Sequence, residues 1–215
     1  MTLHRKQQLC LDAIEHSFSM AEAAYSRVLA YCRLAPSETT EQQNDVMVLD
    51  AWSFVDVAKR LRSVIHNTPG LPHGPIYEVF VRATEALVDF RHYVQHLEDE
   101  TFTVASSGRP IWGSFSWGLF RPDKTVEVRL YVPGRLARTK GIPVMNPAGR
   151  EVHDAVDHFE MSVGDATINL SDIARRIADF RKRFDLALKS APTQGGGDDA
   201  IVVIDLDSSP SATAT

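Results

Sequence analysis

The sequence brings three side chains that could act on a phosphodiester, Arg91, His92 and His96, into one short stretch. An imidazole can take or give a proton near neutral pH, which suits the ribose 2′-hydroxyl or the leaving oxygen of RNA. A guanidinium can hold a phosphate by two hydrogen bonds and stabilise the charge that develops on it. Arg91 and His96 have the spacing Arg-x4-His, and acids follow at 98–100. We therefore predict that Arg91 clamps the phosphate, that His96 is the acid or base, and that His92 and the acids tune the site.

These side chains belong to a helix predicted over residues 76–100. Its apolar residues recur at alternating spacings of four and three, which is typical of one buried stripe: Ile76, Phe80, Ala83, Leu87, Phe90, Val94 and Leu97. His92 and His96 share the opposite, polar face, and Arg91 lies beside the edge of the stripe. On a straight helix the side chains of Arg91 and His96 point about 140° apart. One copy would not converge well on a phosphate, so we predict two copies that meet in a homodimer.

The same polar face allows a metal-binding interpretation. His92 and His96 are i, i+4 neighbours, a spacing that can place two imidazoles on one metal ion. No third ligand follows from the pattern, since His153 and His158 lie far away in the sequence. We predict neither a metal nor a cofactor.

A purely structural interpretation of the motif also stays open. Arg91 would then cover the helix interface with its aliphatic stem, while His96 would face solvent. The pattern arises readily by chance, because Arg60 and His66 form a second Arg-x5-His in the same chain. The third helix is favoured because Arg91 lies there beside the core and close to the acids.

The run 91–96, Arg-His-Tyr-Val-Gln-His, resembles the Arg-x4–6-His motif of HEPN domains, all-helical proteins that include many metal-independent ribonucleases. Residues 50–61, DAWSFVDVAKRL, and residues 97–100, LEDE, are similar to one bacterial HEPN-like subgroup. The resemblance covers about residues 5–102. It implies a dimer whose two motifs face each other, and a role in toxin, phage-defence or RNA-processing systems.

The chain departs from that family at two positions. Active members often have Asn after the arginine, where this chain has His92, and many toxins have Tyr two places after the histidine, where this chain has Glu98. Some HEPN-like proteins are non-catalytic. The alternative is therefore a dimeric interaction or scaffold protein of the same fold.

Composition and charge narrow the class of protein. The chain has 215 residues, 44% of them hydrophobic, and a net charge of −5. Its last 25 residues hold four Asp and no Lys or Arg, so the rest of the chain is close to neutral. A duplex-DNA-binding surface usually needs a basic excess, so we expect RNA, single-stranded or structured, and no duplex DNA. No 18 consecutive residues are apolar, and Cys10 and Cys32 lie too far apart on one helix to bridge. We expect a cytoplasmic protein without a membrane segment.

Periodicity along the chain predicts an α+β fold. Apolar residues at helical spacing indicate an antiparallel bundle of three long helices over residues 5–34, 41–66 and 76–100. Alternation indicates two β-hairpins, with strands near 115–119 and 126–132 and then near 157–163 and 166–170. A final helix, capped by Ser171, is expected to pack back on the bundle.

These elements suggest three parts. We expect a HEPN-like bundle over residues 1–103, β-hairpins and the final helix over 104–189, and a disordered acidic tail over 190–215. On the final helix, Arg175 and Arg176 are predicted to bind the RNA backbone, although acids interrupt this basic group and a solvated face is the alternative.

One segment of the tail differs in composition. From Ile201 to Asp207 a β-branched apolar run is followed by acids, which resembles peptides that add a strand to a partner domain's sheet edge. This segment is a candidate for binding a protein partner. The alternative is a strand that docks on this protein's own sheet.

Overall fold

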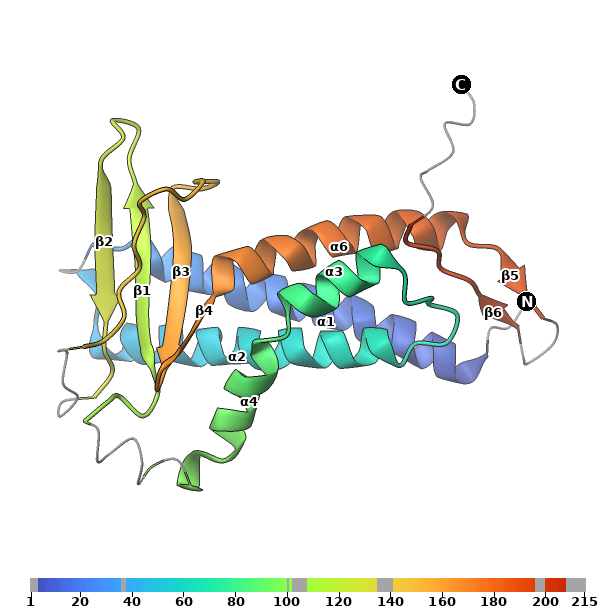
Figure 1. Cartoon of the computed structure of the whole chain (residues 1–215), viewed down its shortest axis with the longest axis horizontal. Coiled ribbons are helices and arrows are strands. Elements are labelled where there is room, and N and C mark those ends of the chain that lie inside the picture. The colour runs from blue at the N-terminus through green and yellow to red at the C-terminus, as the bar shows by residue number, and fades with distance from the viewer. Residues whose placement is uncertain are drawn as a thin grey trace.

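The computed structural model describes residues 4–35, 38–99, 101, 108–134, 141–195 and 200–207. The fold is α+β, as predicted: a bundle of helices carries a four-stranded antiparallel sheet across one end (Figure 1). Within these ranges, no helix combines the length and the apolar character that crossing a membrane requires.

The two longest helices, α1 (Arg5–Cys32) and α2 (Glu41–His66), pack side by side over most of their length. Alanines at the interface allow the backbones to approach closely: Ala21, Ala24, Ala51 and Ala58 are all buried. Helix α2 begins at a capping box, in which Thr40 Oγ1 accepts the Gln43 backbone N–H at 3.2 Å and Gln43 Oε1 accepts that of Thr40 at 2.8 Å.

The predicted third helix is wrong as one continuous element. It is divided into α3 (Pro75–Ala83) and α4 (Leu87–Gln95), with a turn at residues 84–86. In the turn the fully buried Thr84 donates its hydroxyl to the carbonyl oxygen of Phe80 at 2.8 Å. Helix α3 packs on the last long helix and α4 packs on α2, so the two halves serve different partners (Figure 1). The apolar stripe is real, but two packing surfaces share it.

The sheet follows both predicted hairpins. Its strand order is β2-β1-β3-β4, all antiparallel, with β1 at Ser114–Phe120, β2 at Val126–Tyr131, β3 at Val156–Val163 and β4 at Ala166–Asn169. Sheet side chains cap the end of α1, since Trp117 Nε1 donates to the Cys32 carbonyl at 3.2 Å and Arg129 Nη1 donates to it at 3.4 Å.

Helix α6 (Leu170–Ser190) continues directly from β4 and runs back along the bundle. The cap is Asn169 and not Ser171, because the Asn169 Oδ1 accepts the Asp172 N–H at 3.1 Å. The buried stripe of α6 packs against aromatic rings of other helices, with Phe180 at 4.3 Å from Phe80 and at 6.5 Å from Phe18 between ring centroids. One buried cluster thus joins the helices, the sheet and α6.

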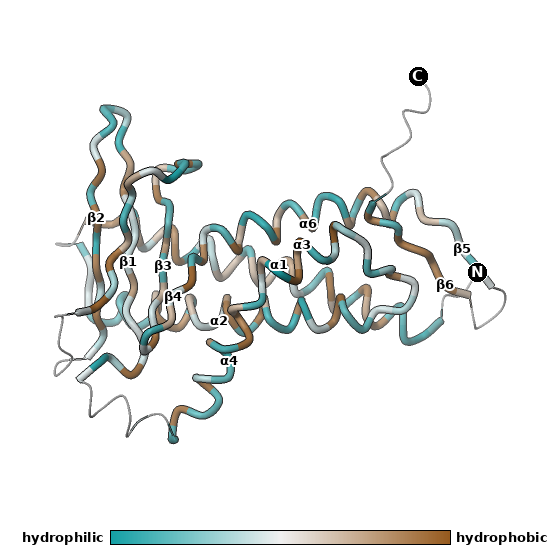
Figure 2. The backbone as a smooth tube through the Cα atoms, in the orientation of Figure 1, coloured by the Kyte–Doolittle hydropathy of each residue, from teal (hydrophilic) through white to brown (hydrophobic). Residues whose placement is uncertain are grey.

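The expectation of a disordered tail is wrong for residues 200–207. Strand β6 (Ile201–Val202) pairs with β5 (Thr193–Gln194), and a hydrophobic stretch there lies against the far end of the bundle (Figure 2). Ile204 is fully buried and Leu206 nearly so. Gln7 fixes the segment, since its Oε1 accepts the Val202 N–H at 2.8 Å and its Nε2 donates to the Val202 carbonyl at 2.6 Å. Apolar burial and these bonds offset the entropy of ordering. Residues 196–199 and 208–215 of the predicted tail lie outside the described ranges.

The sequence left two alternatives for this segment, binding a protein partner or docking on the protein's own sheet, and the structure agrees fully with neither. The segment from Ile201 to Asp207 contacts its own chain, but it pairs with β5 and not with the four-stranded sheet. Asp207 Oδ1 also accepts the Ile76 N–H at 3.0 Å and so caps the start of α3. Binding of an external partner by this segment stays a prediction, and it would require the segment to leave this position.

Candidate functional site

The predicted site on α4 is built around a carboxylate that the motif did not include. Asp56, on α2, accepts Arg91 Nε at 2.7 Å on one oxygen and Arg60 Nε at 2.6 Å on the other. Partial burial would raise the pKa of Asp56, but the hydrogen bonds from Arg91 and Arg60 outweigh it and lower the pKa below its usual value. Asp56 is therefore ionised and holds two guanidinium groups on the surface between α2 and α4.

Arg91 is the more enclosed of the two arginines. Its side chain is 19% exposed, against 62% for Arg60. Its Nη1 also donates to Gln95 Oε1 at 3.3 Å, one turn further along α4. The guanidinium is thus held in one orientation by two neighbours, with its Nε edge turned to Asp56.

The two histidines of the motif form a second pair beside Arg91. The rings of His92 and His96 lie 4.3 Å apart between centroids, and His96 Nδ1 lies 3.8 Å from Asp99 Oδ2. His96 is the C-cap of α4, with φ −112° and ψ 30°, so it no longer follows the straight helix assumed from the sequence. Arg91 contacts Asp56 and Gln95, whereas His96 contacts His92 and Asp99.

The second Arg-x5-His pattern is divided between two places. Arg60 joins the Asp56 cluster, but His66 lies at the end of α2, where its Nδ1 is 2.5 Å from the Tyr77 hydroxyl. His73 stacks on Tyr77 at 4.0 Å between ring centroids, which completes a small aromatic group. Within the described ranges, no group of three or more His, Cys, Asp or Glu side chains could hold a metal ion.

Arg175 and Arg176, predicted to bind RNA together, diverge into different environments. Arg175 Nη1 donates to Asp157 Oδ1 at 2.7 Å, and its Nη2 bonds Asp172. Arg176 lines a groove of about 740 Å³ between α3 and α6, with Arg183 and the apolar side chains of Val79 and Phe180. Neither lies in the Asp56 cluster.

The Asp157 cluster lies at a bulge in β3. Gly118 pairs with Asp157 and Ser116 pairs with Glu160, so two residues, His158 and Phe159, oppose a single residue of β1. His158 has a φ of +51°, which is strained for a residue other than glycine. Bulges of this kind often re-aim side chains near functional sites.

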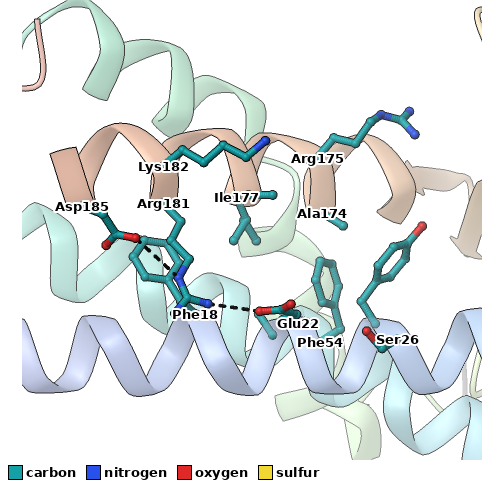
Figure 3. A pocket seen from close by; sticks show the side chains of 13 residues that line it. Phe18, Glu22, Ser26, Phe54, Ala174, Arg175, Ile177, Arg181, Lys182 and Asp185 are labelled. Carbon is teal, nitrogen blue, oxygen red and sulfur yellow. Dashed lines mark hydrogen bonds and ion pairs between the residues drawn. The ribbon is translucent and has the colours of Figure 1, made fainter. Parts of the chain in front are cut away.

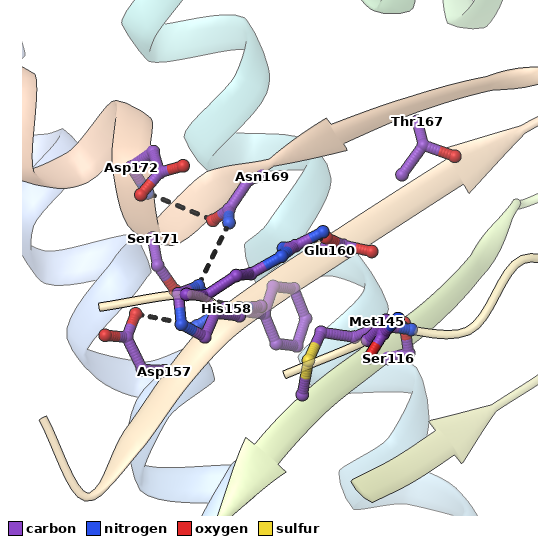
Figure 4. A network of polar contacts seen from close by, with 12 residues as sticks. Ser116, Met145, Asp157, His158, Glu160, Thr167, Asn169, Ser171 and Asp172 are labelled. Carbon is purple, nitrogen blue, oxygen red and sulfur yellow. Dashed lines mark hydrogen bonds and ion pairs between the residues drawn. The ribbon is translucent and has the colours of Figure 1, made fainter. Parts of the chain in front are cut away.

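Asp157 holds the bulge in place. It is fully buried and lies beside His158, whose backbone N–H it accepts at 2.6 Å (Figure 4). It also accepts the backbone N–H of His153 at 2.9 Å and Arg175 Nη1 at 2.7 Å. Burial would raise the pKa of Asp157, but Arg175 and the two backbone donors outweigh it and lower the pKa. The carboxylate is therefore ionised and fully bonded.

A polar cleft of about 580 Å³ opens beside this bulge, lined among others by Arg150, His153, His158, Glu160 and Arg175. Charge pairs neutralise much of it, since Arg150 bonds Glu160. The His158 Nε2 is buried with no hydrogen-bond partner among the described residues. The cleft is thus a polar recess with one unsatisfied imidazole nitrogen, beside a strained backbone.

A third recess, of about 600 Å³, lies between α1 and α6 and is mostly apolar, with Phe18, Phe54 and Ile177 among its lining. Arg181 crosses it, since its Nη1 donates to Glu22 at 3.1 Å and its guanidinium lies 5.6 Å from the Phe18 ring centroid (Figure 3). This ion pair and ring contact bridge the two helices.

Sequence reasoning missed the residues that organise both polar clusters. Asp56 and Arg60 form an i, i+4 pair that is visible in the sequence, but their meeting with Arg91 across 35 positions is not. The residue pattern around Asp157 and His158 does not predict a bulge, because the bulge depends on how β3 pairs with β1. Comparison with protein-family models, with curated proteins and with solved structures finds no match for this chain.

Proposed function

We propose that this protein is a HEPN-like, metal-independent endoribonuclease whose working groups are Arg91 and His96. The observation that carries the proposal is the anchoring of the Arg91 guanidinium by Asp56 beside an exposed pair of imidazoles. An arginine fixed through its Nε keeps its terminal nitrogens in one direction, which suits the clamping of a phosphate. Single-stranded or structured RNA is the substrate class, because its 2′-hydroxyl supplies the nucleophile.

The chemistry follows from these side chains. His96 takes the proton of the 2′-hydroxyl, and the 2′-oxygen attacks the adjacent phosphorus. The bond to the 5′-oxygen breaks, and that oxygen leaves with a proton from a second imidazole, which yields a 2′,3′-cyclic phosphate and a 5′-hydroxyl. Arg91 stabilises the extra negative charge on the phosphate oxygens. His92 contacts His96 and positions its ring.

The second imidazole comes from a second copy of the chain. Arg91 is directed to α2 and His96 to the end of α4, so one copy presents the two groups on different sides. A homodimer in which two α4 helices face each other brings the Arg91 of one copy near the partner's His96. Val88 of α4 is 36% exposed and Trp112 is 47% exposed, and the Tyr93 hydroxyl of α4 bonds the carbonyl of the neighbouring Ile111 at 2.8 Å; both apolar side chains would be covered in such a dimer. A toxin or phage-defence role, implied by the resemblance, is part of the same proposal.

The test is cleavage of labelled RNA in EDTA by the full chain, by Arg91→Ala and by His96→Ala. We expect cleavage without metal in the wild type, and a loss of roughly 10²-fold or more in each variant. Matched controls are Arg121→Ala, at the tip of the first hairpin, and His16→Ala, an exposed histidine of α1, which keep full activity. A wild type that cleaves no RNA, or controls that lose as much activity as the two variants, would refute the proposal.

A second candidate is a non-catalytic interaction protein. One observation favours it: the Arg91 side chain is only 19% exposed, and a carboxylate already occupies its Nε edge. In that case Arg91 joins α2 to α4 and the histidines are solvated. An intact dimer by light scattering together with absence of cleavage would support this candidate.

A further inference from the structure

Strand β2 is an edge of the four-stranded sheet, with β1 on one side and no strand neighbour on the other among the described residues (Figure 1). The Arg121 N–H donates to the Thr125 carbonyl at 3.0 Å, which fixes the phase of the hydrogen bonds between the two strands. Bonded pairs alternate along an antiparallel ladder. Residues 127, 129 and 131 therefore bond to β1, and residues 126, 128 and 130 direct their N–H and C=O groups outward.

The three residues whose backbone groups point away from β1 also have apolar, exposed side chains. Val126, Val128 and Leu130 have relative exposures of 38%, 39% and 38%. An edge strand with free backbone groups and an apolar face is a template for pairing with another strand. The other edge, β4, is shorter, with four residues, and leads directly into α6, so it offers less of such a template.

The inner face of β2 restricts which strand can pair there. Glu127 and Arg129 lie on that face and are partly buried, with Glu127 Oε1 accepting Arg129 Nε at 2.8 Å. Each charge also has partners within the chain, since Arg121 Nη2 donates to Glu127 Oε2 at 2.9 Å and Arg129 Nη1 donates to the Cys32 carbonyl at 3.4 Å. An added strand with an arginine opposite Glu127 and an acid opposite Arg129 extends these pairs across the edge, whereas like charges at these positions repel.

The strand itself has that order. Val126-Glu127-Val128-Arg129-Leu130 has apolar residues at its centre and at both ends, and opposite charges on the two sides of Val128. In an antiparallel pair of two copies about this residue, Val128 opposes the partner's Val128 and Glu127 opposes the partner's Arg129. The charged pairs then fall at the non-hydrogen-bonded positions, where opposing Cα atoms are closest, at about 4.5 Å. The outward backbone groups of residues 126, 128 and 130 bond to their counterparts at the alternate positions.

We propose that β2 pairs antiparallel with β2 of a second copy of this chain, about a two-fold axis at Val128, to form one continuous sheet. The interface is isologous, and its register is set by the Glu127–Arg129 charge pairs and by backbone hydrogen bonds. The proposal goes beyond ribonuclease activity, because β2 contains neither Arg91 nor His96. The two proposals can therefore fail separately.

Cysteine cross-linking of the full chain tests the register. In a Cys10→Ser background, Val128→Cys places two cysteines on the axis, with Cα atoms about 5.5 Å apart and within disulfide range. Val126→Cys places its two cysteines four residues apart in register, about 13 Å, which is beyond that range. Leu130→Cys is equivalent, but Val126→Cys and Leu130→Cys oppose each other across the axis.

Under mild oxidation we expect a covalent dimer from Val128→Cys, none from either other variant alone, and a dimer when Val126→Cys and Leu130→Cys are mixed. Circular dichroism like that of the wild type verifies that each variant is folded. Equal cross-linking of Val126→Cys alone and Val128→Cys, or no cross-linking of a folded Val128→Cys, would overturn the proposal.

A charge reversal in the Cys10→Ser, Val128→Cys background tests the pairing at β2 alone, whether or not two α4 helices also meet. Glu127→Arg places two arginines opposite each other across the axis, so we expect the yield of disulfide-linked dimer to fall at least roughly tenfold. Asp154→Arg, the same charge change on an exposed residue outside β2, leaves the dimer unchanged. Arg129 is kept, because it also donates to the end of α1. A dimer that tolerates Glu127→Arg as well as Asp154→Arg would refute the proposed register.

Discussion

Two carboxylates, Asp56 and Asp157, each hold an arginine from another element, yet they differ in what surrounds them. Asp56 joins α2 to α4, its side chain is 37% exposed, and both its partners are arginines. Asp157 joins β3 to α6, is fully buried, and accepts one arginine and two backbone N–H groups. In both, burial would raise the pKa of the carboxylate, but hydrogen bonds from donors outweigh it and lower the pKa.

This difference indicates that the Asp157 cluster stabilises the fold, whereas the Asp56 cluster leaves side chains available for chemistry. A buried carboxylate that also bonds the backbone cannot be lost without leaving donors unsatisfied in the interior. Removal of a partly exposed carboxylate such as Asp56 costs less free energy of unfolding, because water can replace its hydrogen bonds to the arginines. We therefore expect Asp157 to set stability, and Asp56 to orient Arg91.

The largest effect should come from Asp157→Ala. The change leaves the His158 N–H buried and removes the Asp157 partner of Arg175, so we expect the free energy of unfolding to fall by about 3–5 kcal/mol. Urea denaturation followed by circular dichroism measures it. Asp154→Ala, the loss of an exposed acid nearby, should change stability by less than about 0.5 kcal/mol. If Asp157→Ala also lowers the free energy of unfolding by less than about 0.5 kcal/mol, the proposed difference between the two carboxylates is wrong.

A smaller loss is expected for Ser171→Ala, next to the bulge. The Ser171 hydroxyl accepts the Phe159 N–H at 2.8 Å and the Tyr25 O–H at 2.7 Å, and burial raises the pKa of Tyr25 above its usual value. Without Ser171 both donors are unsatisfied, so the free energy of unfolding should fall by about 1–3 kcal/mol. Ser190→Ala, at the exposed end of α6, is the control. Equal urea midpoints for the two variants would count against this account.

The dependence of stability on pH should separate the two carboxylates. Their pKa values are lowered in the folded state, so each contributes stability that is present above the unfolded value of about 3.9 and lost as pH falls through the folded pKa. From about pH 5 down to about pH 2, the free energy of unfolding should fall less steeply in Asp157→Asn than in the wild type. In Asp56→Asn it should fall only slightly less steeply than in the wild type. Urea midpoints across this range measure it. A steeper loss in Asp157→Asn would reverse the sign and reject the assignment.

The smallest effect on stability is expected for Asp56→Asn, at less than about 1 kcal/mol, because the pair is partly exposed. Under the proposed function this variant still loses activity. An unanchored Arg91 no longer meets the phosphate in one orientation, so RNA cleavage should fall by roughly 10²-fold. Urea denaturation and cleavage in EDTA are measured on the same sample. Destabilisation as large as that of Asp157→Ala would remove the distinction between the clusters.

Much of the fold could be predicted from local patterns. The period of 3.6 located α1, α2 and α6, and the period of two located both hairpins, because each pattern depends on neighbours within a few residues. The break between α3 and α4 could not be predicted, since the stripe continues across it and only the two packing partners decide where it divides.

The candidate site divides in the same way. The motif of Arg91, His92 and His96 was visible from residue types and spacing, but its anchor Asp56 comes from another helix. The bulge at His158 was not visible, because it results from the register of β3 against β1. The docking of Ile204 also depends on contacts far away in the sequence, with the Ile204 N–H bonded to the Gly70 carbonyl at 2.8 Å.

The sequence by itself determined the type of most helices and strands and the chemical character of the α4 motif. Only the tertiary structure decided how Arg91 is oriented, where the third helix breaks, and that residues 200–207 are ordered. The physical reason is range. Periodicity and capping act within a turn or two of the chain, whereas ion pairs, strand register and burial are settled by residues that meet only after folding.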